Sequence, residues 1–238
     1  MRAIIMAAGV GTRISRHLGN KPKCCVQVGP EMIIQRTVRI LRTFGIKNVS
    51  VVLGYEADQV RKALNGFGVR FYVNPFFDIT NSIVSLWLAR EELTHNEDTL
   101  LMNGDLFFEP ALIERVIESP YDRVLFADPR RKVEADYRLT YAHNILKTYG
   151  KELPVEETTG EYIGIAKISS PFLSAFDEHL RELVNKQAHS LWWEDVLYDL
   201  CSKGMNIYVG EIDSCFWAEV DYIEDFERIQ AFLNSQKS

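Results

Sequence analysis

The sequence has few cysteines, and none of them is placed for a metal site or a disulfide framework. Its 238 residues include four, Cys24, Cys25, Cys201 and Cys215. No two are separated by two residues, as zinc and redox motifs require, and adjacent cysteines rarely bridge each other. We therefore expect reduced thiols in a cytoplasmic protein.

Long apolar runs and basic clusters are also missing. No apolar segment reaches 18 residues, and the short N-terminal run ends at Gly9, so neither a membrane span nor a signal peptide is expected. The net charge is −6, from 27 Lys and Arg against 33 Asp and Glu. Because nucleic-acid binding needs clustered positive charge, nucleic acid is not an expected partner. A small phosphorylated ligand needs only a local cationic pocket.

The chain begins with the pattern of a buried strand followed by a glycine loop. Residues 3–8 are continuously apolar, which is typical of a strand covered on both faces. Gly9 and Gly11 let the backbone turn tightly and aim N–H groups at phosphates, and Arg13 and Lys23 supply positive charge. The Walker motif and the third glycine of the dinucleotide fingerprint are absent. Taken alone, the loop is equally compatible with a plain turn, and Lys23 with a solvated lysine.

Strand-like and helix-like segments alternate over the first 127 residues. This alternation predicts βαβ units, and the length suits a single α/β domain, Rossmann-like, with a mostly parallel mixed sheet flanked by helices. Ligands of such sheets bind at the carboxyl ends of the strands. The expected strands are residues 2–7, 49–53, 69–73, 99–102 and 124–127, and the expected helices lie near 31–44, 56–65, 82–93 and 110–118.

The pattern changes after residue 127. Residues 128–160 are polar and turn-rich, and we assign no strand or helix to them. We interpret residues 1–127 as the nucleotide-binding part and residues 128–238 as the acceptor-binding part of one domain, 1–238. The later strands are expected at 161–168, 206–209 and 216–218, and the later helices at 172–186, 191–201 and about 223–233.

Acidic side chains follow two of the expected strands. Asp105 comes just after a buried strand, and Glu219 and Asp221 are two residues apart, on one face of a short strand. One acid from each segment is suited to Mg²⁺, which prefers oxygen ligands and often shares them with substrate phosphates. Asp105 is also compatible with a simple turn, and Asp221 with the N-cap of the last helix.

Two further groups of polar and aromatic residues carry possible binding roles. Thr80, Asn81, Ser82 and Ser85 open a helical segment, where they either cap the helix or contact a nucleotide base or ribose. Aromatic faces backed by carboxylates hold an ammonium group well, but the tryptophans also follow the helical spacing of core residues, so we expect at most two aromatics to touch a substrate. The candidates for this acceptor site are Glu161, Tyr162, Trp192, Trp193, Glu194, Trp217 and Glu219.

The chain resembles the nucleotidyltransferase family, which makes nucleotide-diphospho-sugars and CDP-alcohols. The signature is Ala7-Ala8-Gly9-Val10-Gly11-Thr12-Arg13 followed by Pro22-Lys23, and the resemblance covers nearly the whole chain. Within the family, the chain looks most like the bacterial phosphocholine and 2-aminoethylphosphonate cytidylyltransferases. The segments that carry this likeness are Asn81-Ser82-x-x-Ser85-Leu86, Gly160-Glu161-Tyr162-x-Gly164 and Trp217-x-Glu219-x-Asp221. The order Lys151-Glu152 departs from the Glu-Lys-Pro element of the sugar enzymes.

The resemblance implies a role for each segment. It implies that Asp105 and Asp221 hold Mg²⁺, that Lys23 contacts the α-phosphate, and that Arg13 contacts the β- and γ-phosphates. Lys23, Arg13 and Asp105 are then the catalytic residues. The nucleotide would be bound by Ala7, Ala8, Gly9, Gly11, Thr12, Arg13 and Lys23 on the phosphate side and by Gly54, Tyr55, Asn81, Ser82 and Ser85 on the base side.

The implied activity is Mg²⁺-dependent transfer of CMP from CTP to a small phosphorylated amino-alcohol or phosphonate, with release of pyrophosphate. Products of this kind decorate cell-surface glycans or lipids, and the enzyme is expected as a monomer or homodimer. Two alternatives stay open. One is a sugar-1-phosphate or inositol-1-phosphate nucleotidyltransferase, and the other is a non-catalytic nucleotide-binding module.

Overall fold

A nine-stranded sheet forms the centre of the computed structural model, which describes residues 1–11 and 21–236. The strand order is β5-β4-β1-β6-β11-β8-β12-β10-β9. Of these nine strands, β11 and β10 run against the others, so the predicted mostly parallel mixed sheet is confirmed. The bounds are β1 (Arg2–Ala7), β4 (Asn48–Leu53), β5 (Arg70–Val73), β6 (Thr99–Asn103), β8 (Arg123–Asp128), β9 (Arg138–Ala142), β10 (Ile145–Gly150), β11 (Gly160–Ile168) and β12 (Tyr208–Glu211).

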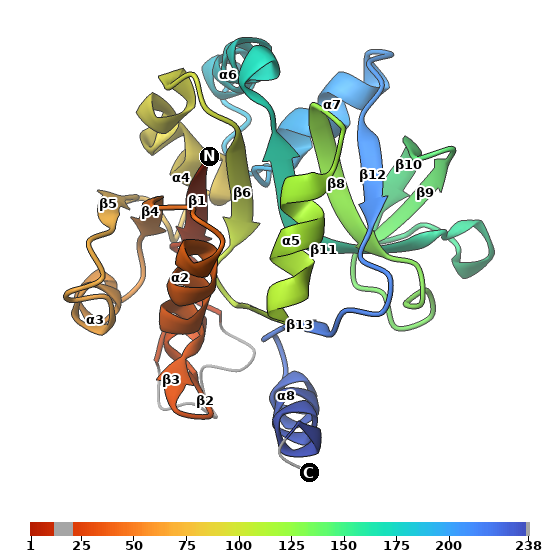
Figure 1. Ribbon diagram of the computed structural model, residues 1–238. Coiled ribbons are helices and arrows are strands. Elements are labelled where there is room, and N and C mark those ends of the chain that lie inside the picture. Colours follow the sequence, from red (N-terminus) through yellow and green to blue (C-terminus); the bar gives the residue numbers. More distant parts are fainter. Residues whose placement is uncertain (12–20, 237–238) are drawn as a thin grey trace.

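Helices cover both faces of this sheet (Figure 1). Successive strand residues point to opposite faces, so Ile5 and Val51 pack in one core and Ile4 and Val52 in the other. This two-sided burial explains the continuous apolar strand at the start of the chain. One face carries α2 (Ile33–Thr43), α3 (Ala57–Ala63) and α5 (Pro110–Glu118), and the other carries α4 (Ser82–Leu88), η2 (Arg90–Thr94), α6 (Ser170–Asn185) and α7 (Asp195–Ser202).

A third, smaller core lies below the sheet in the view of Figure 1. Its main structural feature is the antiparallel pair β7 (Leu106–Phe108) and β13 (Trp217–Glu219), which is covered by the C-terminal helix α8 (Ile223–Ser235). The pairing matches Leu106 with Glu219, and the Val220 N–H donates to the carbonyl of Asp105 at 3.1 Å. Segments more than 100 residues apart are thereby joined beside the end of β6. The remaining short elements are η1 (Lys23–Cys25), β2 (Gln27–Val28), β3 (Glu31–Met32) and η3 (Val155–Glu157).

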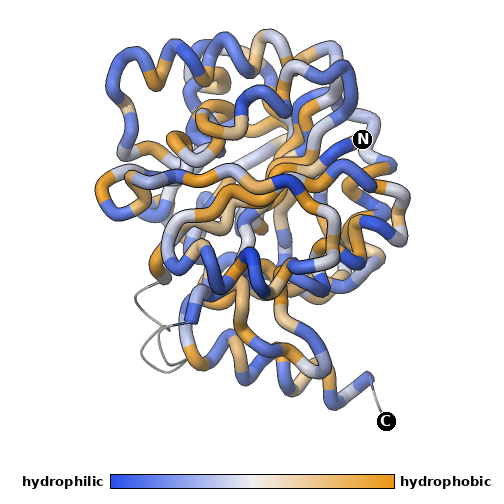
Figure 2. Tube along the Cα trace, turned by 90° about the vertical axis from the view of Figure 1, so that its left-hand side faces the viewer, coloured by the Kyte–Doolittle hydropathy of each residue, from blue (hydrophilic) through white to orange (hydrophobic). Residues whose placement is uncertain are grey.

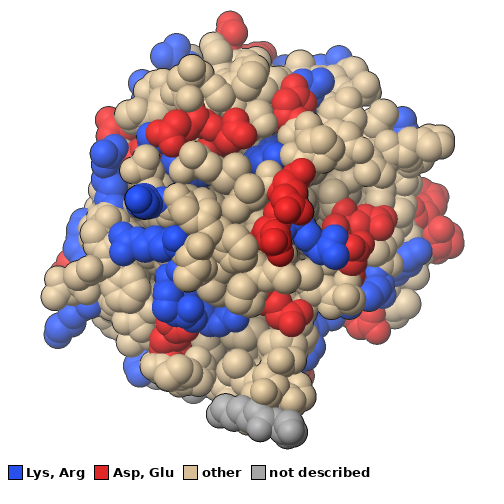
Figure 3. Space-filling model, in the orientation of Figure 1, with Lys and Arg blue, Asp and Glu red and all other residues tan. Residues whose placement is uncertain are grey.

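Apolar segments run through the middle of the molecule, as the hydropathy colouring of Figure 2 shows. On the face shown in Figure 3, basic side chains gather toward the left-hand side and acidic ones toward the centre and right. Among the helices of the described residues, none combines the length and the apolar character needed to cross a membrane. The four cysteines are free thiols, and Cys24, Cys25 and Cys215 are buried.

Most of the expected strands and helices are present, with shifted ends, but the short pair β2–β3, the hairpin β9–β10 and the strand β7 were missed. Residues 128–160 contain the hairpin of β9 and β10, whose two-residue turn, His143-Asn144, has positive φ angles of 51° and 60°. Such a turn suits a hairpin, but the pair lacks the glycine by which it is usually recognised. The strand β7 was also missed, because it follows β6 after only two residues.

Two helix ends also differ from the expectation. The segment 82–93 divides into α4 and η2, and the segment 191–201 becomes helical only at Asp195. Asp221 is not the N-cap of the last helix, since Tyr222 occupies that position. The Asp221 side chain is instead paired with Lys23.

Candidate functional site

The site lies where the ends of β1, β4 and β6 meet, and two glycines make this close approach possible. The Gly104 N–H donates to the Met6 carbonyl at 2.8 Å, and a Cβ on Gly104 would lie only 2.8 Å from that oxygen. A Cβ on Gly54 would lie 2.6 Å from the Ala8 carbonyl oxygen. Side chains at these positions would push the strand ends apart.

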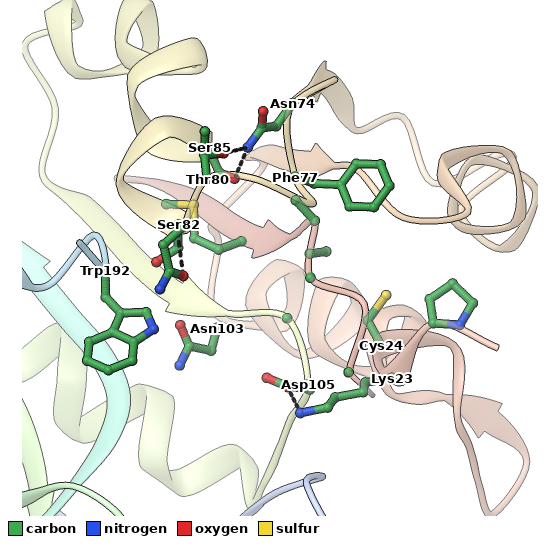
Figure 4. Close-up of a pocket in the computed structure, with 18 of the residues that line it drawn as sticks. Lys23, Cys24, Asn74, Phe77, Thr80, Ser82, Ser85, Asn103, Asp105 and Trp192 are labelled. Carbon is green, nitrogen blue, oxygen red and sulfur yellow. Dashed lines mark hydrogen bonds and ion pairs between the residues drawn. The ribbon is translucent and has the colours of Figure 1, made fainter. Parts of the chain in front are cut away.

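The first of two cavities at this edge has a volume of about 230 Å³. Figure 4 shows it, with Asn74, Thr80 and Ser85 on one side and Lys23 with Asp105 on the other. The predicted nucleotide and metal residues that line it are Ala7, Ala8, Gly9, Gly11, Lys23, Asn81, Ser82, Ser85 and Asp105.

Polar side chains on the α4 side of this cavity form hydrogen bonds within the protein. The Asn81 side chain caps α4 by accepting from the Ser82 N–H at 2.9 Å, so its capping role is realised. Asn74, which follows β5, donates through Nδ2 to Thr80 Oγ1 at 3.1 Å and to Ser85 Oγ at 3.2 Å. These bonds fix amide and hydroxyl groups on the cavity wall, where they are oriented before any ligand arrives.

Lys23 lies between two carboxylates from distant parts of the chain. Its Nζ forms ion pairs with Asp221 and, at 3.4 Å, with Asp105. Figure 4 shows the pair with Asp105. Gly11, with φ of +61°, makes room for it, since a Cβ there would lie 2.6 Å from Lys23 Cε. The structure thus brings together three residues that the sequence separates by almost 200 positions.

Glu219 adds a third carboxylate to this cluster. Burial, and next the charge of Asp105, raise the pKa of Glu219 to about 8, while Lys23 lowers it. Asn103 Nδ2 donates to Glu219 Oε1 at 3.2 Å. The described residues contain no set of three or more acidic, His or Cys side chains arranged to hold a metal by themselves. A cation at this point would therefore share its ligands with a substrate or water.

The second cavity, of about 420 Å³, adjoins the first. The two share Gly11, Lys23, Asn81, Ser82, Asn103, Trp192 and Glu219 along their common wall. The rest of the second cavity comes from the later half of the chain, with Asp136, Tyr137, Lys151, Glu161, Tyr162, Gly164, Glu194 and Asp221. Lys23 and the carboxylates around it therefore lie at the junction of the two cavities.

Two glutamates on the wall of the second cavity differ in their surroundings. Burial raises the pKa of Glu161, but Glu161 is paired with Arg131 and accepts from the Asp136 N–H at 2.7 Å. Glu194 is 7% exposed, and burial raises its pKa to about 8. Glu194 Oε2 has no hydrogen-bond partner. Glu161 is held by an ion pair and a backbone hydrogen bond, whereas Glu194 has a backbone hydrogen bond but leaves Oε2 without a partner.

The structure does not bring every predicted residue to the cavities. Trp193 is fully buried and donates from Nε1 to Asn103 Oδ1 at 2.9 Å, so it belongs to the core. Trp217 donates to Asp128 Oδ2 at 3.0 Å and lines a separate cleft beside Arg130. Both rings are therefore withdrawn from the predicted acceptor site. Trp192 and Tyr162 remain on its wall.

The predicted pair on the base side, Gly54 and Tyr55, also lies outside both cavities. Gly54 serves the close approach of the strand ends, and the Tyr55 N–H donates to the Ala8 carbonyl at 3.0 Å. Thr12 and Arg13 lie outside the described residues. Tyr137 was missed, because it lies in the segment without an assigned strand.

Asn74 and Asn103 were missed as well, although each carries a sequence signal. Each lies at or next to the carboxyl end of a strand, β5 or β6, and an amide at this edge of a parallel sheet is a candidate ligand contact. Asn103 accepts a hydrogen bond from Trp193 in the core and donates one to Glu219 on the cavity wall.

Comparison with known proteins agrees with this architecture. The family model for the MobA-like NTP transferase domain matches residues 3–187, which is most of the chain. The chain belongs to this family. The predicted resemblance to nucleotidyltransferases is thereby confirmed, and the protein is a nucleotidyltransferase.

Two relatives of this NTP transferase match it over nearly their full lengths. The CTP:phosphoglutamine cytidylyltransferase of Campylobacter jejuni is 28% identical, over 95% of this chain and 98% of that protein. The choline-phosphate cytidylyltransferase of Streptococcus pneumoniae is 24% identical, over 99% and 100%. A solved structure of CTP:phosphocholine cytidylyltransferase from Streptococcus pneumoniae superposes with a TM-score of 0.79 at 21% identity, covering 98% of each chain. This similarity shows the nucleotide-diphospho-sugar transferase fold.

Proposed function

We propose that this NTP transferase transfers CMP from CTP to a small phosphorylated amino-alcohol or its phosphonate analogue, releasing pyrophosphate. The observation that carries the proposal is the position of Lys23, which lies between Asp105 and Asp221 at the junction of the two cavities. One cavity is lined by amides, hydroxyls and a glycine loop, and the other by aromatic rings and carboxylates. The names of the full-length relatives, which are cytidylyltransferases, support the choice of CTP.

The reaction needs little covalent help from the protein. A phosphate or phosphonate oxygen of the acceptor attacks the α-phosphorus of CTP and forms a new P–O bond. The bond from this phosphorus to the α,β-bridging oxygen breaks, and pyrophosphate leaves with the electron pair. Because the attacking oxygen is already an anion at neutral pH, no general base is required. The obstacle is bringing two anions together, which positioning and positive charge overcome.

We assign Lys23 the task of overcoming this charge repulsion. Its Nζ lies at the cavity junction, where the reacting phosphorus would stand between nucleotide and acceptor. We assign Lys23 to the α-phosphate and to the charge that develops during transfer. Arg13, assigned by resemblance to the β- and γ-phosphates, remains a prediction. The loop at Gly9 and Gly11 supplies backbone N–H groups beside the same phosphates.

Asp105 and Asp221 fit a magnesium ion. Both carboxylates converge on one cation, the ammonium of Lys23, and carboxylate oxygens are ligands that Mg²⁺ prefers. When bound there, Mg²⁺ would supply charge stabilisation to the phosphates. The chain's own contribution is to hold the two carboxylates in place, one through the end of β6 and the other through β13.

The two parts of the chain divide the substrates between them in this proposal. Residues 1–127 provide the glycine loop, Lys23, Asp105 and the amides and hydroxyls near α4, which can read the amine donor and ring acceptors of cytosine. Residues 128–238 provide most of the second cavity, which we assign to the acceptor.

Substitution at the cavity junction tests the assigned chemistry. We expect Lys23→Met and Asp105→Asn each to lower CTP-dependent pyrophosphate release by at least about 100-fold, because each removes a charge that acts during transfer. Circular dichroism and thermal melting check that the fold survives. Near-normal rates in both folded variants would refute the proposal.

A further inference from the structure

Two buried oxygen atoms of the acceptor cavity have no hydrogen-bond partner. They are Glu194 Oε2 and Tyr162 Oη, and both residues line the second cavity. Glu194 is 7% exposed and Tyr162 is 6% exposed. Buried polar atoms are nearly always paired, so two orphaned ones on the same cavity wall indicate where a ligand completes the bonding.

Glu194 also lacks a counter-ion among the described residues. The nearest cationic influence is Lys151, whose Nζ is paired with Asp136 at 2.8 Å. The neighbouring Asp195 adds to the negative field, and burial is the main reason why the pKa of Glu194 is raised to about 8. A buried carboxyl without a counter-ion avoids the cost of burying a charge by keeping its proton, and a bound ammonium group would favour release of that proton.

The aromatic rings of this cavity are less available to a cation than their number implies. Lys151 Nζ lies 5.5 Å from the centroid of the Trp192 ring, so the protein already places a cation beside that ring. Tyr137 is stacked on Tyr198 at 5.4 Å with an interplanar angle of 11°, which covers one of its faces. The two unpartnered oxygens, Glu194 Oε2 and Tyr162 Oη, are therefore better placed to bind an ammonium group than the rings of Trp192 and Tyr137, which already have partners within the protein.

We propose that the acceptor carries an ammonium group with N–H donors, which bonds to Glu194 Oε2 and Tyr162 Oη, and that Glu194 thereby selects a primary amine over a trimethylammonium group. This inference rests on the proposed function, because it assigns the second cavity to the acceptor. A trimethylammonium group has no N–H, and its methyl groups would leave both oxygens unpaired. A site built to pair with donors rejects a ligand that lacks them.

The first test needs no mutation. With CTP fixed, kcat/KM is measured for phosphoethanolamine and its N-methyl, N,N-dimethyl and N,N,N-trimethyl derivatives, the last of which is phosphocholine. We expect a decline of about 10- to 100-fold across the series, with the largest step when the final N–H is lost. Equal or higher kcat/KM for phosphocholine would overturn the inference.

Substitution of Glu194 provides the second test. Glu194→Gln is expected to lower kcat/KM for phosphoethanolamine by at least about 10-fold, mainly through KM, while phosphocholine changes much less. Glu178→Gln, the same chemical change on the exposed surface of α6, is the matched control and should leave both acceptors unaffected. Equal losses for both acceptors in the Glu194 variant would contradict a role in selecting the amine.

The outcome separates this inference from the proposed function. If pyrophosphate is released with CTP and phosphocholine at least as well as with phosphoethanolamine, the transferase function stands and the selectivity fails. If no aminated acceptor supports release while a sugar phosphate does, the proposed function fails with it.

Discussion

At the scale of single residues, the ion cluster of Lys23, Asp105 and Asp221 is the central feature. One ammonium group sits between two carboxylates, at the point where we place the divalent cation. A metal ion bound there would compete with Lys23 for the same oxygens until a nucleotide offered Lys23 its phosphates. Under this proposal, binding of the metal and of the nucleotide would both depend on Lys23.

The exchange predicts an unusual effect of removing Lys23. Without nucleotide, Lys23→Met should bind Mn²⁺ more tightly than the unaltered protein, by about 3- to 10-fold, because a positive charge has left the carboxylates. Electron paramagnetic resonance of free Mn²⁺ measures this directly, independently of turnover. Weaker Mn²⁺ binding in the variant would show that Lys23 organises the carboxylates rather than competing for them.

Glu194 predicts how stability depends on pH. Its pKa is raised to about 8 in the folded protein, whereas an unfolded glutamate titrates near about 4.3. Between these values the folded state holds a proton that the unfolded chain releases, so this group makes stability fall as pH rises from about 5 to about 8. Glu194→Gln removes the effect.

The measurement is thermal melting without ligands. The variant should melt at least about 4 °C above the unaltered protein at pH 9, while the difference at pH 5 should be small. A difference of the same size at both pH values would mean that the substitution changes packing and that the pKa of Glu194 is not raised.

At the scale of elements, β11 shows how the fold positions the site. Its pairing with β8 shifts register between Tyr162 and Ala166, and Gly164, inside the shift, has φ of +75°. A Cβ on Gly164 would lie 2.8 Å from Asn103 Nδ2, the group that bonds Glu219. This irregularity of the strand therefore leaves room for the amide that connects β6 to the cavity.

Gly164→Ala is expected to reduce both stability and activity. The strained φ should cost about 1–3 kcal/mol, and the displaced Asn103 should lower kcat/KM by about 10-fold or more. Gly204→Ala is the matched control, because Gly204 also has a positive φ, of +90°, but faces open space. The control should lose stability without losing activity. Equal activity in the two variants would show that the irregularity of β11 at Gly164 does not position Asn103.

Some elements and contacts of this fold are set by tertiary packing and leave no clear pattern in the local sequence. The turn residues of the β9–β10 hairpin, His143 and Asn144, have positive φ angles. A glycine in the turn would have been a clear sequence signal for this hairpin, but neither residue is a glycine. The positions of Trp193 and Trp217 could not be read from spacing, because a tryptophan in the core and one on a cavity wall follow the same pattern. Their indole N–H groups pair with Asn103 and Asp128, contacts set by the tertiary fold.

At the scale of the whole molecule, the arrangement follows from strand direction. Parallel strands end at one edge, so the glycine loop after β1 and Asp105 after β6 could be predicted at the same edge of the sheet. The meeting with Asp221 depends on the pairing of β13 with β7, which the sequence did not predict. The family resemblance supplied that contact, and the structure shows the strand pair behind it.

A crossed substrate panel tests CMP transfer to an aminated acceptor. Pyrophosphate release is measured with Mg²⁺ for CTP, UTP, GTP, ATP and dTTP against phosphoethanolamine, 2-aminoethylphosphonate, phosphocholine, glucose-1-phosphate and inositol-1-phosphate, and the cytidylylated product is identified by mass. We expect release with CTP and an aminated acceptor, matched by an equal amount of cytidylylated product. Release confined to a sugar or inositol phosphate, or to UTP or dTTP, would contradict this proposal.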